Sequence, residues 1–435
     1  MLELTVKSND FLKEEYSFYK HKSGLDVYVF PKKLSTAYAL FATKYGSNDS
    51  RFKLEGDSEF TVVPDGIAHY LEHKLFENPN GEDTFSRFAK YGASANAYTS
   101  NTVTAYLFSC TSNFKESLEV LLDFVKTPYF TPETVQKEQG IIAQEIRMYD
   151  DHPFRRLYHM LLEGLYEKNN IRINVAGTVE SISHITAETL YECYRVFYNL
   201  SNMMLIVCGD VTAEEVNEVC DRVLKGEAPV RIIRDYPEES AEVFRKRSEY
   251  AMQVSKPLFA IGVKDVDIPS DPAERMVKSA TADVLNDVLF GKAGDFFNRL
   301  YEEGMVSGSF DGGYSISEGY AFNSLFNEGS DPDAVFEKFC EYVEDVKKNG
   351  LSREDFERSK RALYAAMVKC FDSTDDIANY FLSFKVDGGD LLDYVDIRSK
   401  VTYEDAAALL EKAFKPEYYS LAIVKPLEKE DSENA

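Results

Sequence analysis

Short apolar runs alternate with longer amphipathic segments along the whole chain. The runs are rich in aromatic and β-branched residues and are bounded by glycine, proline or asparagine, which is typical of β-strands. Strands of this kind are predicted at residues 25–32, 37–46, 104–112, 202–211 and 419–426. The longer segments repeat their apolar residues at helical spacing, as in residues 212–226. The pattern therefore predicts an α+β protein.

The pattern of the first half of the chain recurs in the second half. HYLEHKLFE at 69–77 aligns with DVLNDVLFG at 283–291, and residues 85–98 align with 297–310. Every matched segment lies 212 to 221 residues from its counterpart. Several matches in the same order at a near-constant offset indicate a duplication. We expect two related α/β halves, each a sheet with helices packed on one face.

A polar stretch with two prolines separates the halves. Because a chain of 435 residues is too long for one ordinary core, two domains are expected. We predict an N-terminal domain at 1–225, an exposed linker at 226–246 and a C-terminal domain at 247–435.

Two of the six histidines lie four residues apart, in a segment bracketed by PDG at 64–66 and NPNG at 78–81. This bracket predicts a helix of about three turns. Residues i and i+4 share a helix face, so His69 and His73 can bind one tetrahedral metal ion. Glu72 lies at the edge of that face, where it can act as general base on a metal-bound water. The arrangement is the H-x-x-E-H motif of inverzincins.

The simpler interpretation is two solvated histidines on an amphipathic helix whose core face is Leu71 and Leu75. The duplicated helix offers a comparison, because it keeps both leucines and has Asp283, Asn286 and Asp287 in place of the histidines and the glutamate. The fold therefore does not need these polar residues, and those of the first half call for another explanation.

A catalytic zinc needs a third protein ligand and an open position. The best candidate lies on a helix expected from Thr131, a natural N-cap followed by proline, to about residue 152. Its Glu138 and Glu145 are seven residues apart and share a face with isoleucines, where a cation would offset the cost of burying two carboxylates. The second half has Ala366 opposite Glu145. A solvated acidic stripe is the alternative interpretation.

Composition narrows the classes of function. A net charge of -25 argues against nucleic-acid or anionic-membrane surfaces and weakly favours basic peptides. No apolar stretch has the length of a membrane span, and the first 20 residues resemble neither a signal peptide nor a mitochondrial presequence. No P-loop is present. The cysteines are scattered without a CxxC pair, as expected of reduced thiols in a cytoplasmic protein: Cys110, Cys193, Cys208, Cys220, Cys340 and Cys370.

The motif, with a glutamate about 72 residues after it and another glutamate seven positions before that one, resembles the pitrilysin-type zinc peptidases. These include insulin-degrading enzymes and processing peptidases. The segment GASANAYTSNTVTAY at 92–106 also resembles the edge strand on which that family receives substrate. The resemblance covers essentially the whole chain, including duplicated halves with a degenerate second metal site.

The resemblance implies a role for each matching residue. One zinc ion per chain would be bound by His69, His73 and Glu145, with Glu72 as general base on its water and Glu138 as an accessory acid. Extended peptide would add to the sheet beside Asn96 and Ala97. Asp150 or Asp151 would orient a ligand histidine.

The sequence departs from the family pattern in its second half. Many active members carry there an arginine followed seven residues later by a tyrosine, which hold the substrate carbonyl; Leu300 and Ser307 stand at these places. In the family the zinc motif and the Arg/Tyr pair can be split between subunits. We therefore expect a zinc endopeptidase that works with a related partner subunit, because a homodimer would not restore the missing pair. The alternative is a non-catalytic zinc-binding or peptide-binding subunit.

Overall fold

The structure is a computed structural model of the chain and describes residues 2–308 and 310–427. The chain divides into two compact units, each built from three segments. Of the described residues, unit 1 comprises 2–146, 173–236 and 369–386, and unit 2 comprises 147–172, 237–308, 310–368 and 387–427. Each unit is described by itself. No helix of the described residues is long and apolar enough to cross a membrane.

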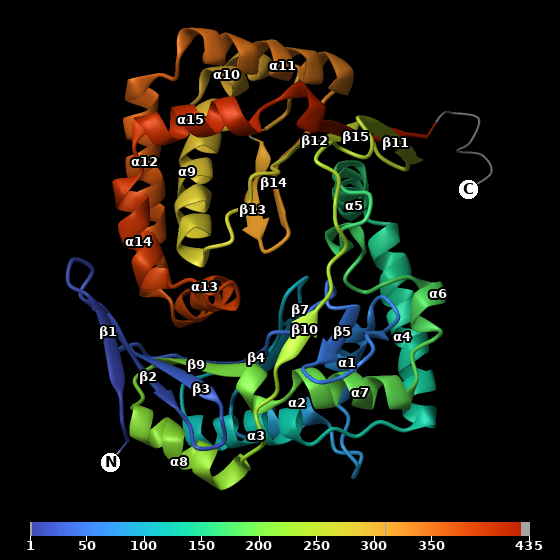
Figure 1. Cartoon of the computed structure of the whole chain (residues 1–435), viewed down its shortest axis with the longest axis vertical. Helices are drawn as coiled ribbons and strands as arrows, with labels where there is room; N and C mark the ends of the chain where they lie inside the picture. Colours follow the sequence, from blue (N-terminus) through green and yellow to red (C-terminus); the bar gives the residue numbers. More distant parts are fainter. Residues whose placement is uncertain (1, 309, 428–435) are drawn as a thin grey trace. The chain divides into compact units, whose positions relative to one another are not determined.

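In the described residues of unit 1, seven strands form one sheet in the order β1-β2-β3-β9-β4-β8-β7 (Figure 1). All neighbours are antiparallel except β3 and β9, which are parallel. The strands predicted at 25–32, 37–46, 104–112 and 202–211 are confirmed as β3, β4, β8 and β9. The strands are β1 (Thr5–Asn9), β2 (Glu14–Lys20), β3 (Asp26–Pro31), β4 (Ala37–Thr43), β7 (Ser94–Thr99), β8 (Thr104–Cys110) and β9 (Met203–Gly209).

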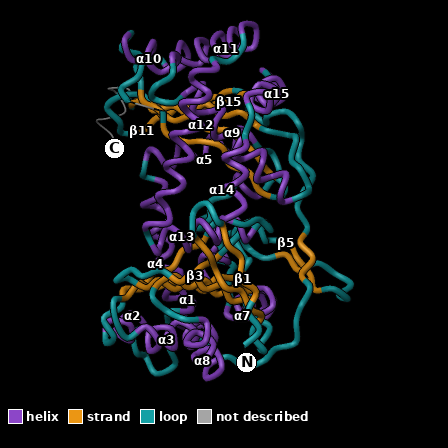
Figure 2. Tube along the Cα trace, turned by 90° about the vertical axis from the view of Figure 1, so that its left-hand side faces the viewer, coloured by secondary structure: helices purple, strands orange, loops and turns teal. Residues whose placement is uncertain are grey.

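Helices from the first half of the chain pack on one face of this sheet, as predicted, and one helix from the second half, α13 (Thr374–Val386), covers the other. Figure 2 shows the sheet between α13 and the layer that contains α3 and α8. The first-half helices are α1 (Ile67–Leu75), α2 (Thr84–Ala89), α3 (Phe114–Lys126), α4 (Pro132–Asp150), α6 (Val179–Ile182), α7 (Ala187–Phe197) and α8 (Ala213–Val223).

The described residues of unit 2 repeat this plan. Its five strands have the order β11-β15-β12-β14-β13, which matches β3-β9-β4-β8-β7 strand by strand, including the single parallel pair. The duplication expected from the sequence is therefore confirmed by topology. The strands are β11 (Arg247–Met252), β12 (Leu258–Lys264), β13 (Asp311–Ser317), β14 (Tyr320–Glu328) and β15 (Tyr419–Pro426). The second-half helices are α9 (Pro272–Phe290), α10 (Asp295–Glu302), α11 (Pro332–Asn349), α12 (Arg353–Val368), α14 (Leu391–Lys400) and α15 (Tyr403–Ala413).

The two halves exchange one helix each. Phe381 of α13 is fully buried against Tyr16, Tyr28 and Phe30 of the unit 1 sheet, at ring-centroid distances of 4.9–5.0 Å. Reciprocally, α5 (Pro153–Leu165) from the first half packs on β12 and β15 of unit 2. A Cβ at Gly262 of β12 would lie 2.7 Å from the Leu161 Cδ1 atom, so glycine at this position leaves room for the leucine side chains of α5 against the strand.

The stretch expected to be an exposed linker contains a short strand. Ile232–Arg234 forms β10, which pairs with β5 (Arg51–Leu54) in a small sheet completed by β6 (Thr61–Val62). Arg234 Nε donates to the buried Asp49 (2.8 Å), and Tyr236 donates to the same oxygen (3.1 Å). This part of the segment is held to unit 1 by buried polar contacts, which the polar composition did not reveal.

Candidate metal centre

The helix that carries the motif begins at a backbone turn suited to glycine. Gly66 has φ 91°, and a Cβ there would lie 2.4 Å from the Ala176 carbonyl oxygen. Helix α1 then runs from Ile67 to Leu75, as the bracket of turn residues predicts. Tyr70 and Leu75 face the core, at most 1% exposed. Packing on this side leaves the opposite face of α1 to the polar residues of the motif.

The second helix of the site, α4, begins at the expected cap. Thr131 Oγ1 accepts a hydrogen bond from the Thr134 backbone N–H (3.3 Å), and Pro132 is the first helical residue. The Tyr70 hydroxyl donates to the Val135 carbonyl oxygen, which joins α1 to the first turns of α4. Helix α4 thus holds its acidic face beside the motif.

The structure brings together the three residues expected to bind zinc. Glu145 Oε1 lies 3.7 Å from His69 Nε2, and Glu145 Oε2 lies 3.4 Å from His73 Nε2. One ligand atom from each residue falls within 4.8 Å of the others. Ligands at about 2.0–2.1 Å from a tetrahedral zinc are roughly 3.3–3.5 Å apart, so the cluster is close to the size that zinc requires. The donor set, two imidazoles and a carboxylate, also fits.

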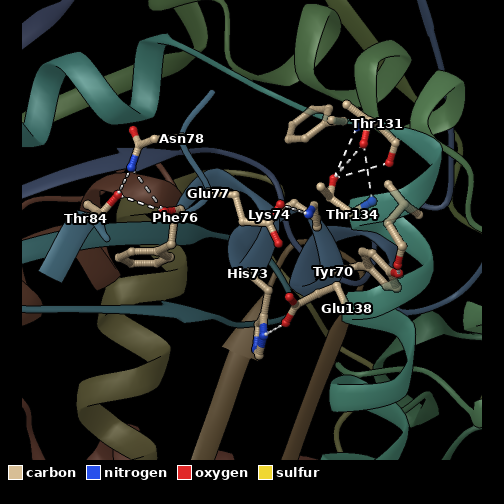
Figure 3. A network of polar contacts seen from close by, with 12 residues as sticks. Tyr70, His73, Lys74, Phe76, Glu77, Asn78, Thr84, Thr131, Thr134 and Glu138 are labelled. Carbon is tan, nitrogen blue, oxygen red and sulfur yellow. Dashed lines mark hydrogen bonds and ion pairs between the residues drawn. The ribbon is translucent and has the colours of Figure 1, made fainter. Parts of the chain in front are cut away.

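Glu138 makes a direct contact with the site. Its Oε1 lies 3.0 Å from His73 Nδ1, and Figure 3 shows the two side chains pointing toward each other from α4 and α1. A carboxylate on the second nitrogen of a histidine fixes the ring with its other nitrogen free to bind a metal. The family resemblance implied this role for Asp150 or Asp151. Both of those residues are exposed at the C-terminal end of α4.

Glu72 is 8% exposed and is held by a contact that no sequence pattern indicated. The hydroxyl of Thr99, on β7, donates to Glu72 Oε2 at 2.7 Å. Alternation along a strand makes Thr99 and Ala97 share one face of β7, but sequence pattern cannot say that this face meets α1. The base expected from the motif thus lies between the ligand helix and an edge strand.

Burial and neighbouring charges shift the pKa values of the two histidines in opposite directions. Burial lowers the pKa of His69 to about 4, so this imidazole is neutral and able to bind a metal. Burial also lowers the pKa of His73, but its bonds to Glu138 and Glu145 outweigh burial and raise it to about 10. The raised pKa of His73 has its cause in these two carboxylates, which favour a positive charge beside them. A divalent cation supplies such a charge.

Asn96 and Ala97 lie on β7, the last strand of the sheet order, where an extended peptide could pair with the edge. The Asn96 side chain accepts a hydrogen bond from the Ala97 backbone N–H (2.9 Å). On the other face of the strand, Tyr98 donates to Asn379 of α13 (3.0 Å), which in turn donates to the Tyr38 hydroxyl (3.0 Å). The edge strand is therefore fixed from both faces.

In the second half of the chain, the residues that align with the metal motif make other contacts. Asp283, opposite His69 in the sequence alignment, is paired with the buried Arg398 and accepts from Tyr394 (2.9 Å). Asn286, opposite Glu72, donates to Asn323 (2.6 Å). Among the described residues, the cluster on α1 and α4 is the group of histidine, cysteine and acidic side chains that could hold a metal.

Leu300 and Ser307, which stand where the family pattern has arginine and tyrosine, both make contacts within unit 2. Leu300 is 1% exposed, packed in the core of unit 2, and Ser307 donates to Glu328 (2.7 Å). Neither side chain is a cation or a phenol, so neither can replace an arginine or a tyrosine that holds an oxyanion.

Comparisons with known proteins show the family to which the chain belongs. Residues 63–179 match the family model for insulinase (peptidase family M16), and residues 184–363 match the model for the peptidase M16 inactive domain. The chain is 40% identical over 421 residues to a Bacillus subtilis protein named uncharacterized zinc protease YmfH, covering 95% of this chain and 97% of that one. It is 23% identical to zinc protease PqqE of Helicobacter pylori, over 93% of this chain and 91% of that one.

Solved structures show the same fold. The crystal structure described as that of an M16-like peptidase from Alicyclobacillus acidocaldarius superposes with a TM-score of 0.91 at 34% identity, covering 95% of this chain and 99% of that chain. A protease from Helicobacter pylori gives a TM-score of 0.79 at 19% identity, covering 95% and 100% of the two chains. The chain therefore belongs to the insulinase family of peptidases, family M16.

Proposed function

We propose that the chain is a zinc-dependent endopeptidase that hydrolyses extended or unfolded peptides. The observation that carries the proposal is the cluster of His69, His73 and Glu145 with Glu72 beside it, on two helices joined by a hydrogen bond. A structural zinc site has four protein ligands, whereas this one offers three and a neighbouring carboxylate. The zinc protease names of the relatives support the same class of function.

Each residue of the site has a role in the proposed hydrolysis. Zinc, when bound, supplies a Lewis acid that makes a water more acidic at neutral pH. Glu72 takes a proton from the attacking water and later delivers it to the leaving amine. Glu138 keeps the His73 ring in its binding orientation through Nδ1. Asn96 and Ala97 hold the peptide backbone as an added strand, so binding depends on main-chain hydrogen bonds more than on one side-chain pocket.

We further propose that a related partner chain completes the active site. Leu300 and Ser307 cannot stabilise negative charge on a substrate carbonyl oxygen, and a second copy of this chain would bring the same two residues. A homologous subunit carrying arginine and tyrosine at these positions would supply what is missing. The acidic balance of the chain favours basic peptides as substrates.

A non-catalytic, zinc-binding or peptide-binding subunit is the second candidate, favoured by the same two residues. The placement of Glu72 argues against it, because a site that only holds a metal has no need of a buried, oriented carboxylate beside its ligands.

The test compares the wild-type chain with Glu72→Gln, alone and with proteins that copurify with it. Zinc content is measured on both, and cleavage is followed on unfolded and basic peptides. We expect equal zinc content, with cleavage lost in the variant by a factor of about 100 or more. Equal cleavage by the two proteins would reject the enzyme proposal and leave the binding subunit.

A further inference from the structure

The hydroxyl of Thr99 reaches the proposed base from a different element, the edge strand β7. It donates to Glu72 Oε2 at 2.7 Å, and the carboxylate is 8% exposed. A hydrogen bond to a charged acceptor in a buried place is stronger than one between neutral groups, so it restricts the rotation of the carboxylate. Because Oε2 is engaged, Oε1 remains to act on the proton of an attacking water.

The direction of the Thr99 hydroxyl hydrogen follows from its neighbour. Thr104 Oγ1 lies 3.4 Å from Thr99 Oγ1, close enough to compete for a hydrogen bond. Thr104 uses its own hydrogen on the Tyr45 carbonyl oxygen (2.9 Å), so it can act toward Thr99 only as a weak acceptor. The shorter bond to the carboxylate therefore takes the Thr99 hydrogen.

The hairpin that carries Thr99 is held rigidly. Its turn is closed by Ser100 N–H donating to the Val103 carbonyl oxygen (2.8 Å), and the Ser47 and Asn48 N–H groups donate to the carbonyls of Ser100 and Asn101 (3.0 Å each). The turn also packs tightly against the backbone at Gly46. A Cβ at position 46, which is glycine, would lie 2.3 Å from the backbone of residue 101. The turn cannot move without breaking these contacts.

We infer that Thr99 is a positioning residue, which orients the Glu72 carboxylate and ties it to the strand on which the peptide is held. The inference rests on the proposed function, in which Glu72 is the base and β7 the substrate strand. One rigid hairpin then sets both the register of the peptide and the aim of the base. The distance between the peptide and the base is then well defined, which is what proton transfer from an attacking water to Glu72 requires.

The experiment compares three substitutions in one hairpin, each made in the full chain with its partner if one is needed. Thr99→Val removes the hydroxyl at nearly constant shape, Thr99→Ser keeps it, and Thr102→Val makes the same chemical change in the turn while leaving the bond to Glu72 intact. We expect Thr99→Val to lower kcat about tenfold to hundredfold with KM within about twofold and zinc content unchanged. The kcat of Thr99→Ser should stay within about threefold of the wild-type value. The kcat of Thr102→Val should equal that of the wild type.

Several results would overturn the inference. The first is a wild-type kcat for Thr99→Val. The second is a loss of kcat in Thr99→Ser as large as that in Thr99→Val. The third is a loss of bound zinc from the Thr99→Val protein. Glu72→Gln is measured alongside: if it retains wild-type activity the proposed function fails, whereas if it is inactive while Thr99→Val is fully active only the present inference fails.

A second readout needs no activity. Urea unfolding of the metal-free protein is measured for Thr99→Val, Glu72→Ala and the double variant. The contact predicts that the double variant loses less stability than the two single losses combined, and strictly additive losses would overturn the inference.

Discussion

Replacing Glu138 by glutamine tests the role of the carboxylate behind His73. The change keeps the shape of the side chain and removes its charge, and the amide can turn its NH2 group toward His73 Nδ1. Because one partner of this 3.0 Å bond is a carboxylate, it belongs to the charge-assisted kind, worth about 1.5–3 kcal/mol. If that energy orients the ring for binding, its loss weakens zinc affinity by roughly 10- to 150-fold, which overlaps the range seen when such partners are removed elsewhere.

The assay is competition for zinc between the protein and a chromophoric chelator of known affinity. Glu133→Gln is the matched control, since Glu133 is exposed in the first turn of the same helix and the substitution is identical. Zinc affinity should fall for Glu138→Gln and stay within about twofold for Glu133→Gln. An affinity equal to that of wild type in the Glu138 variant would refute the orienting role, and an equal drop in both variants would point to a general effect of charge.

Three further outcomes are expected. Phe381→Ala should destabilise unit 1 by about 3–5 kcal/mol in urea unfolding, because the fully buried ring joins α13 to the sheet; a change below about 1 kcal/mol would contradict this packing. Burial raises the pKa of Glu239, but bonds from the N–H groups of residues 167–169 outweigh burial and lower it, so this part of the stability is present above pH 4.5 and is lost as the pH falls below it. Glu239→Gln should therefore show a shallower loss of stability in acid than wild type, and parallel curves would disprove the assignment. Chelation of zinc should lower the melting temperature of the wild type, whereas His69→Ala should melt at the same temperature with and without chelator; equal chelator sensitivity would place the metal elsewhere.

Local spacing was sufficient to predict the motif helix and the residues that share its polar face. His69 and His73 share a face because they are four residues apart, and Glu138 and Glu145 share one because they are seven apart. Both facts follow from helix geometry alone. That the two helices meet depends on Tyr70 and the packing around it, so the third ligand was expected only as a candidate and through the family resemblance.

Contacts between distant segments lay beyond any local pattern. Thr99 is an ordinary strand residue in sequence, and alternation gives its face but not what covers that face. Arg234 and Asp49 are 185 residues apart and belong to a buried network, which the polar composition of residues 226–246 does not predict. Helices α5 and α13 have the amphipathic pattern of any surface helix, and nothing in it indicates that each covers the sheet of the other half.

The exchange of α5 and α13 has a consequence for synthesis on the ribosome. About 180 residues separate the end of β9 from the end of α13, which corresponds to roughly 9–36 s of translation at about 5–20 residues per second. During this interval Tyr16, Tyr28 and Phe30 lack the helix that buries them. Strand β7, with Thr99, also lacks its contact to Asn379. The nascent N-terminal half therefore has one apolar face of its sheet uncovered. All residues of the metal cluster lie in the first 145 positions, but the α13 contacts that hold its sheet form only after residue 386 has been made.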